Sequence, residues 1–418
     1  EGSRVMGLGI ASIRDLMLFL RDESLDADGV PNPLYGYTDK LYAYGQSLSA
    51  RVVRQFIYDG YNASSNQRRV FDAVYPHVSG GGRLFANARF AQVGRYPRQH
   101  EEHQWPSERY PFAYSAVPDL YSEELDSVLK RPDSDPLVMH SHTNTEYWLR
   151  HASLGHTDPR NGEDLAIPEG VRIYVLASAQ HAGLNGPAED ISQQAPNVMS
   201  NGPSLRAALS LMDSWATDGT APPASQIPLR VDGTLVEAAS ALSSFPSVPG
   251  FNTPVAPSQL PLYDYGPSFA QGHVTEHPPK PVAGQMYSVF VPQVDVDGND
   301  VAGIRSPEIE APVGTHTGWA VRKKGFAGGD LASLAGSFVP FARTKADRVK
   351  ANDPRLSIEE RYGTHTGYVE AVAEAAAKLV SKGFLLQEDA DRYLEAAQRR
   401  NPLDRSTPLA PLSFTSGS

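Results

Sequence analysis

Leu41-Tyr42-Ala43-Tyr44-Gly45-Gln46-Ser47-Leu48-Ser49, which runs on into residues 50–58, is the stretch that decides the fold. Its first four residues are typical of a short strand, and residues 50–58 are typical of a helix. A strand, a tight turn of small residues that carries a serine, and a helix together indicate a nucleophile elbow. Gly45 and Ser49 are small because the backbone closes tightly around the serine. We therefore predict that the hydroxyl of Ser47 is presented at the end of a strand.

Outward from this turn, residues 1–217 alternate between helical and strand-like patterns. A helix is expected over residues 11–21 and another over 204–216, because apolar residues recur there at helical spacing. Strands are expected at 70–75, ending at Pro76, and at 136–139 and 171–176. Strands that alternate with helices predict an α/β fold, with a mostly parallel sheet covered by helices on both faces. Residues 1–217 would form this core.

The remaining segments of the chain differ from this core in composition and in their secondary-structure patterns. Residues 79–134 are irregular, contain arginines and aromatic residues, and lie where a lid-like insertion is expected; they would either contact an anionic or aromatic substrate or form a solvated loop. Residues 218–330 are rich in Pro and Gly and are expected to pack on the core as an extension. Residues 331–418 read as a helical region with a loose tail from Pro402. Gly383 separates its last two helical segments as a C-cap.

Composition narrows the classes of function. The chain has 418 residues, 40% of them hydrophobic, a net charge of −11 and no cysteine. The absence of cysteine excludes disulfides, thiolate zinc sites and thiol nucleophiles. An acidic chain disfavours nucleic acid as a partner, and no apolar run approaches the roughly 20 residues of a membrane span. We expect no cofactor, and composition fixes neither compartment nor oligomeric state.

A serine needs a base to remove its proton and a third group to orient that base. In enzymes built on such an elbow, the chain order is serine, acid, histidine. The acid follows the strand two beyond the elbow strand, and the histidine follows the last strand. Glu146 and His181 occupy these positions after the strands at 136–139 and 171–176. Glu146 has an alternative interpretation as a helix N-terminal carboxylate after Thr143 or Asn144.

Histidine clusters supply a rival interpretation as a metal-dependent hydrolase. His140-x-His142 would place two imidazoles on one face of a strand, and His100-x-x-His103 is a second cluster. Neither completes a recognised metal signature, so we assign no metal ligand. Residues 295–300 are acidic but lack the order of a calcium loop and are expected to form a hairpin turn.

Two further alternatives remain open. The pentapeptide Gly-Thr-His-Thr-Gly occurs twice and supplies two rival histidines, His316 and His365, which rank below His181. A non-catalytic binding protein that keeps only part of a hydrolase core is the third class of function.

Several segments together resemble a bacterial family of large α/β-hydrolase domain proteins of uncharacterised substrate. More distantly, the elbow is similar to those of glucuronoyl esterases and tannase-like feruloyl esterases. The chain departs from the family at Ala50, where a glycine is usual. The resemblance implies a hydrolase of small carboxylic esters that works through an acyl-enzyme, with Ser47 as nucleophile, Glu146 as acid and His181 as base. It rests on residues 44–62, 68–72, 76–80, 144–148, 152–154, 172–174, 180–181, 318–319 and 353–362.

The elbow lies within the first fifty residues, which is early for such a hydrolase. The backbone N–H of Leu48 is expected to be one donor of the oxyanion hole. The second donor normally comes from a loop well before the elbow. We therefore expect that the chain lacks an N-terminal part, including the first strands and this second donor.

Overall fold

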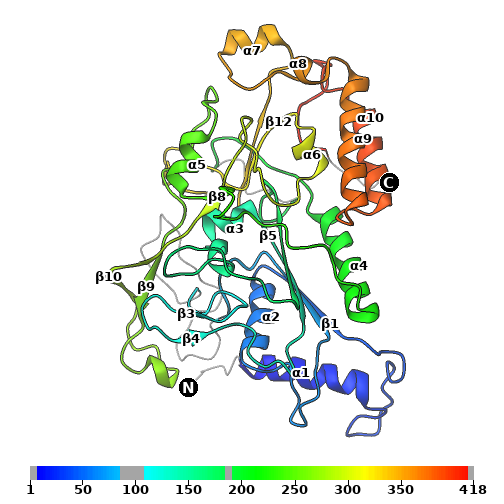
Figure 1. Cartoon of the computed structure of the whole chain (residues 1–418), viewed down its shortest axis with the longest axis vertical. Coiled ribbons are helices and arrows are strands. Elements are labelled where there is room, and N and C mark those ends of the chain that lie inside the picture. The colour runs from blue at the N-terminus through cyan, green and yellow to red at the C-terminus, as the bar shows by residue number, and fades with distance from the viewer. Residues whose placement is uncertain (1–6, 85–107, 184–190, 413–418) are drawn as a thin grey trace.

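A parallel sheet of four strands forms the centre of the computed structural model, which describes residues 7–84, 108–183 and 191–412 (Figure 1). The strands are ordered β1 (Tyr42–Gln46), β2 (Ala73–His77), β5 (Leu137–Thr143) and β6 (Val171–Leu176). Every adjacent pair is parallel. The predicted α/β-hydrolase fold class is confirmed in its central feature, a parallel sheet flanked by helices.

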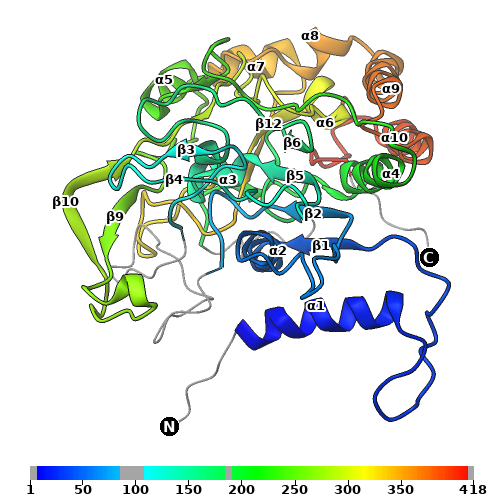
Figure 2. The same ribbon diagram turned by 60° about the horizontal axis from the view of Figure 1, so that its bottom comes forward.

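Alternate residues of each strand enter different cores, because successive side chains of a strand point to opposite faces of the sheet. Val74 and Val138 pack with the elbow helix α2 (Leu48–Tyr58) on one face. Tyr75 and Met139 pack on the other face with α4 (Gly202–Asp218). Figure 2 shows α2 and, beyond it, α1 (Gly7–Asp22) on one side of the sheet. The sheet is therefore buried on both faces.

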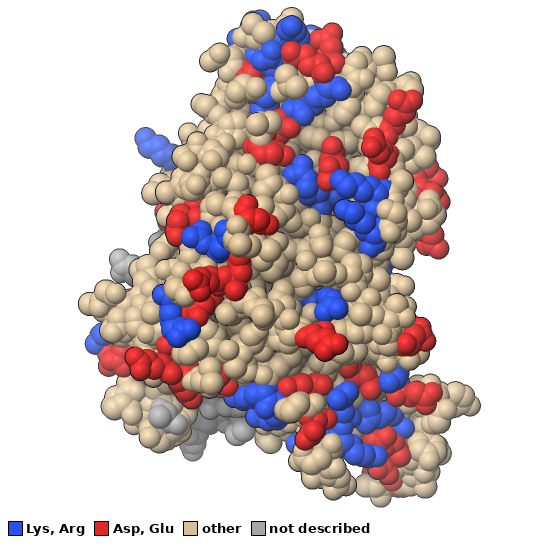
Figure 3. Space-filling model, in the orientation of Figure 1, with Lys and Arg blue, Asp and Glu red and all other residues tan. Residues whose placement is uncertain are grey.

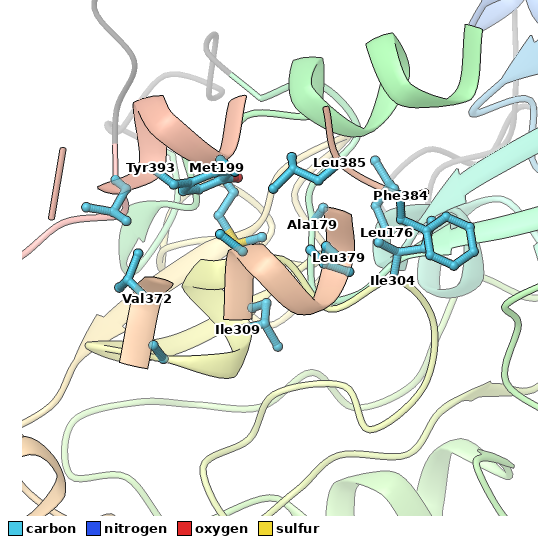
Figure 4. Close-up of a cluster of buried hydrophobic side chains, with 14 of the residues drawn as sticks. Leu176, Ala179, Met199, Ile304, Ile309, Val372, Leu379, Phe384, Leu385 and Tyr393 are labelled. Atoms are coloured by element: carbon cyan, nitrogen blue, oxygen red, sulfur yellow. The ribbon is translucent and has the colours of Figure 1, made fainter. Parts of the chain in front are cut away.

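Two C-terminal helices complete the second core. They are α9 (His365–Ser381) and α10 (Gln387–Arg399), and Figure 4 shows their apolar side chains meeting residues from the end of β6. Gly383, with φ +78°, ends α9 in the left-handed conformation that favours glycine. Contrary to the loose tail expected from Pro402, residues 402–412 are held: Arg343 and Arg400 donate to their carbonyl groups, and Leu412 is buried.

Short elements surround this framework. The outer edge of β6 continues through parallel bridges from Tyr174 to Gln226 and from Leu176 to Ile304. Within the part of the chain that the structure describes, no helix is long and apolar enough to cross a membrane. The further elements are α3 (Asn144–Leu149), η1 (Ala152–Gly155), α5 (Ala238–Ser244), η2 (Phe269–Gln271), α6 (Pro307–Glu310), α7 (Lys345–Ala351), α8 (Ile358–Tyr362), β3 (Val117–Pro118), β4 (Leu125–Asp126), β7 (Ala195–Pro196), β8 (Leu235–Val236), β9 (Leu260–Asp264), β10 (Lys280–Tyr287), β11 (Val291–Pro292), β12 (Gly314–Thr317) and β13 (Ser337–Pro340).

One strand boundary differs from the prediction. Pro76 was expected to end its strand, but β2 continues through it to His77. Proline lacks the N–H that a central strand donates, and the pairing of β2 with β5 accordingly skips residues 75 and 76. On the other side, Pro76 keeps its register opposite Gly45 of β1. The two extra residues bring the end of β2 level with the elbow.

Candidate active site

The elbow has the strained geometry that its sequence predicts. Ser47 lies between β1 and α2 with φ +59° and ψ −117°, a conformation that non-glycine residues rarely adopt. Its N–H donates to the carbonyl oxygen of His77 at 2.9 Å. A Cβ on Gly45 would lie 2.8 Å from the backbone nitrogen of Ala50, so only glycine fits there. The turn therefore fixes Ser47 at the carboxyl end of the sheet.

The hydroxyl of Ser47 does not cap the helix that follows it and is available to another hydrogen-bond partner. Ser47 is the N-cap residue of α2, but its side chain makes no capping hydrogen bond. Instead Ser47 Oγ lies 2.9 Å from Nε2 of His181. Nδ1 of His181 lies 2.6 Å from Oε1 of Glu146. The structure thus brings the three predicted side chains into one hydrogen-bonded row.

The direction of these hydrogen bonds follows from the carboxylate. An ionised carboxylate only accepts, so Nδ1 of His181 carries the proton and donates it to Glu146. In the neutral imidazole, Nε2 then carries no proton and accepts the hydroxyl of Ser47. This is the tautomer that a general base requires.

Glu146 uses its two oxygens for two different partners. It is the third residue of α3, and its Oε2 accepts from the N–H of Thr143 at 2.9 Å and from the Thr143 hydroxyl at 2.5 Å. This is a capping box. Burial alone would raise the pKa of Glu146, but His181 and the Thr143 hydrogen bond lower it to about 2. Glu146 is therefore ionised at neutral pH, as both the helix-cap and the acid interpretations require.

The loop that carries His181 is held from the helix that carries Glu146. Thr145, one residue before Glu146, accepts the N–H of His181 at its Oγ1, at 3.0 Å. The same hydroxyl donates to the carbonyl oxygen of Gly318 at 2.5 Å. His181 is almost fully buried, at 5% exposure. Sequence reasoning did not single out Thr145, whose only signal was its place beside Glu146.

Leu48 is the first residue of α2. The first N–H groups of a helix have no acceptor within the helix, and they favour negative charge. This position suits an oxyanion donor next to Ser47, and the role of Leu48 stays a prediction.

His140, one of the rival histidines, has two structural partners. His140 Nε2 lies 3.0 Å from Ser79 Oγ, and His140 Nδ1 lies 3.0 Å from the hydroxyl of Tyr114. Burial lowers the pKa of His142, the neighbour of His140 on β5, to about 3. Among the described residues, no group of three or more His, Asp or Glu side chains is arranged to hold a metal ion. His100 and His103 lie outside the described residues.

The other two candidate histidines, His316 and His365, also lie outside the row formed by Ser47, His181 and Glu146. His316 is buried in β12, where its Nδ1 lies 3.1 Å from Asn197 Oδ1, and Nε2 of His365 hydrogen-bonds the carbonyl oxygen of Ala397.

Residues 295–300 form a turn, as predicted, in which Gly298 N–H donates to the carbonyl oxygen of Asp295 at 3.0 Å.

Buried arginines tie the lid-like segment to the elbow helix. Arg51 of α2 donates to Glu108 at 2.5 Å and to the carbonyl oxygen of Ser79 at 2.9 Å. Arg54, one turn further along α2, donates to the carbonyl oxygens of Gly80, Gly82 and Phe112 in this segment. Arg83 and Arg109, two further arginines of this segment, lie over the rings of Tyr58 and Phe269. Residues 85–107 lie outside the described residues.

A parallel sheet with a serine elbow after one strand, and an acid and a histidine after two later strands, defines the α/β-hydrolase class. Residues 6–395 match the family described as Alpha/beta hydrolase domain, and the chain belongs to this family. No curated protein and no solved structure matches the chain. The family assignment supports a hydrolase.

Proposed function

We propose that this protein is a serine hydrolase that cleaves carboxylic esters through an acyl-enzyme, with Ser47 as nucleophile, His181 as base and Glu146 as the acid that orients the base. The observation that carries the proposal is the unbroken row of contacts, 2.9 Å from Ser47 to His181 and 2.6 Å from His181 to Glu146. The strained elbow at Ser47 supports the same role, because strain of this kind is concentrated at functional sites.

In the acylation step, Ser47 Oγ attacks the ester carbonyl carbon while Nε2 of His181 takes the hydroxyl proton. The carbonyl oxygen becomes an oxyanion, for which the Leu48 N–H is the proposed donor. When the tetrahedral intermediate collapses, the bond to the alcohol oxygen breaks, and His181 returns the proton to that oxygen. The alcohol leaves, and the acyl group remains on Ser47.

In the deacylation step, water repeats the attack on the acyl-enzyme. His181 takes a proton from the water and returns it to Ser47 Oγ as the carboxylic acid leaves. Glu146 stays ionised throughout and stabilises the imidazolium that forms twice in each cycle. No other reactant is needed.

The choice of an ester rests on the resemblance to esterases and on chemistry, because an alcohol is expelled more readily than an amine. A small-molecule substrate suits a chain whose net charge is −11, which does not favour nucleic acid. On the face shown in Figure 3, basic and acidic side chains are interspersed and form no single basic surface.

The test is covalent labelling with a fluorophosphonate probe, followed by identification of the labelled peptide. The proposal expects a single adduct on Ser47 that is lost in Ser47→Ala. Ser49→Ala is the matched control, because Ser49 is a serine two residues further on, in α2, and lies outside the hydrogen-bonded row.

The outcomes separate the three classes of function. Labelling at Ser47 with ester hydrolysis that a chelator does not change supports the serine hydrolase. Hydrolysis that a chelator abolishes, in a chain that the probe does not label, would instead indicate a metal-dependent enzyme. A folded chain with neither labelling nor hydrolysis would indicate a binding protein.

A further inference from the structure

A buried carboxylate outside the row, Asp300, lies between the helix that carries Glu146 and the loop that carries His181. Asp300 is 2% exposed. Its two oxygens lie 2.8 Å and 2.9 Å from Nδ2 of Asn144, the first residue of α3. Oδ2 also accepts the N–H of Ser178, in the loop after β6, at 2.6 Å. One carboxylate therefore joins the two segments that supply the acid and the base.

The contact with Ser178 is reciprocal. The N–H of Asp300 donates to Ser178 Oγ at 2.8 Å, so two hydrogen bonds join the two residues. Ser178 has φ +57°, which a non-glycine residue adopts only when its surroundings enforce it. Asn197 adds a third restraint by donating to the Ser178 carbonyl oxygen at 2.7 Å. The backbone is thus fixed three residues before His181.

The contact with Asn144 has a fixed direction. Oδ1 of Asn144 accepts the N–H of Gly318 at 3.0 Å, so the amide NH2 group of Asn144 must face Asp300 as a donor. The carbonyl oxygen of Gly318 also accepts a hydrogen bond from the hydroxyl of Thr145, and this hydroxyl in turn accepts the N–H of His181. The restraints on both segments therefore meet in one network.

The network matches the ionised form of Asp300, because every contact to its side chain comes from a donor. Burial raises the pKa of Asp300 to about 7, against the opposing effects of the Ser178 N–H, Asn144 and Arg305. Across the part of the chain that the structure describes, no basic side chain forms an ion pair with its oxygens. A buried carboxylate without an ion pair destabilises a fold. Such buried groups with shifted pKa values are concentrated at functional sites.

We propose that Asp300 is a positioning residue for the hydrolysis proposed above, and that it sets the separation of Glu146 and His181 without touching the reacting atoms. The inference rests on the proposed function. Loss of Asp300 would release both segments, and the 2.6 Å contact between Glu146 and His181 would become longer or less well aligned.

The experiment compares Asp300→Ala and Asp300→Asn with Asp389→Asn. Asp389 is an equally buried carboxylate, 1% exposed, that pairs with Arg206 and Arg392 on the C-terminal side of the molecule. We measure kcat and KM on a p-nitrophenyl ester, the rate of fluorophosphonate labelling, and the downfield proton resonance of His181 Nδ1–H.

The Asp300→Ala variant is expected to lower kcat by about 10²-fold, the effect of a misplacement near 1 Å, with little change in KM. Labelling should slow in parallel, and the downfield resonance should shift or disappear. The Asp300→Asn variant keeps one acceptor oxygen but turns an NH2 group towards a donor, so an intermediate loss is expected. Asp389→Asn should match the wild type in all three measurements.

Folded Asp300 variants with the wild-type kcat and an unchanged downfield resonance would overturn the inference. Wild-type labelling at Ser47 would then still support the proposed function. A wild type that is not labelled would remove the proposed function, and this inference with it. If Asp300→Ala does not fold, Asp300→Asn and its resonance decide the question.

Discussion

Replacement of Glu146 by glutamine tests the proposed triad most directly, because it removes the charge and keeps the shape. The amide that results has one oxygen and one NH2 group. Thr143 supplies two donors to Oε2, so the amide oxygen is expected to turn towards Thr143. The NH2 group then faces Nδ1 of His181, which must accept. This arrangement protonates Nε2, the nitrogen that has to take the proton from Ser47.

The size of the effect follows from the wrong tautomer. The equivalent change of acid to amide in a Ser-His-Asp triad lowers kcat by ~10⁴-fold. That factor corresponds to ~5 kcal/mol of activation free energy. Glu146→Gln should therefore have a kcat ~10⁴-fold below wild type, with a KM that stays close to the wild-type value because Glu146 is fully buried.

The same variant has a second, independent signature in acid stability. The pKa of Glu146 is about 2 in the folded chain against an ordinary value of 4.5. A depressed pKa stabilises the fold above pH 4.5, and this contribution, of the order of 3 kcal/mol, is lost as the pH falls towards 2. Glu146→Gln should lack this part of the acid-dependent loss of stability.

Two assays measure these effects. Steady-state hydrolysis of a p-nitrophenyl ester gives kcat and KM, and ¹⁵N NMR of histidine identifies which ring nitrogen of His181 is protonated. Urea unfolding at a series of pH values gives the stability. A Glu146→Gln variant that keeps kcat within tenfold of wild type, with Nδ1 still protonated, would refute the role assigned to Glu146.

Three further substitutions test the framework of the site. Gly45→Ala would place a Cβ less than 3 Å from elbow backbone atoms, so it should destabilise the fold by roughly 1–3 kcal/mol in urea unfolding, whereas Gly9→Ala, with open space around it, should not. Equal stability of the two variants would contradict the elbow geometry. Gly318→Ala would set a Cβ 2.6 Å from Asn144 Cβ and should lower kcat by moving α3; a wild-type kcat would argue against this coupling. Arg54→Met removes a donor from three buried carbonyl oxygens and leaves those of Gly82 and Phe112 without one, at ~1–3 kcal/mol each; it should speed proteolysis within residues 79–134, and an unchanged cleavage rate would show that Arg54 does not hold this segment.

The sheet and the position of the elbow could be predicted because their signals are local. The strand predicted at 171–176 is present, and the helix predicted at 204–216 lies within α4, since one is an apolar run and the other a periodic segment bounded by clear breaks. Pro76 shows the limit of a local rule. Proline is expected to end a central strand, but only tertiary pairing decides which neighbour loses a hydrogen bond, and here β5 skips those residues.

The supporting residues of the site could not be predicted in this way. Asp300 contacts residues that are 156 and 122 positions away in the sequence. In the sequence it was one acidic residue of an expected turn, and that turn is present. Asn144 was weighed only as a possible helix cap. Polar residues that act through long-range hydrogen bonds carry no periodic pattern, so their roles emerge only when the fold brings them together.

The two interpretations of Glu146 were alternatives only if one carboxylate could have one role. Its Oε2 closes the capping box with Thr143 and its Oε1 contacts His181, so the helix cap orients the carboxylate that we propose as the acid. Ser47 shows the opposite arrangement at α2. It is the N-cap residue, but its side chain makes no hydrogen bond to the backbone of the helix, and its hydroxyl contacts His181 instead. The start of one helix therefore fixes the proposed acid through a satisfied cap, and the start of the other leaves the hydroxyl of the proposed nucleophile uncommitted to a cap.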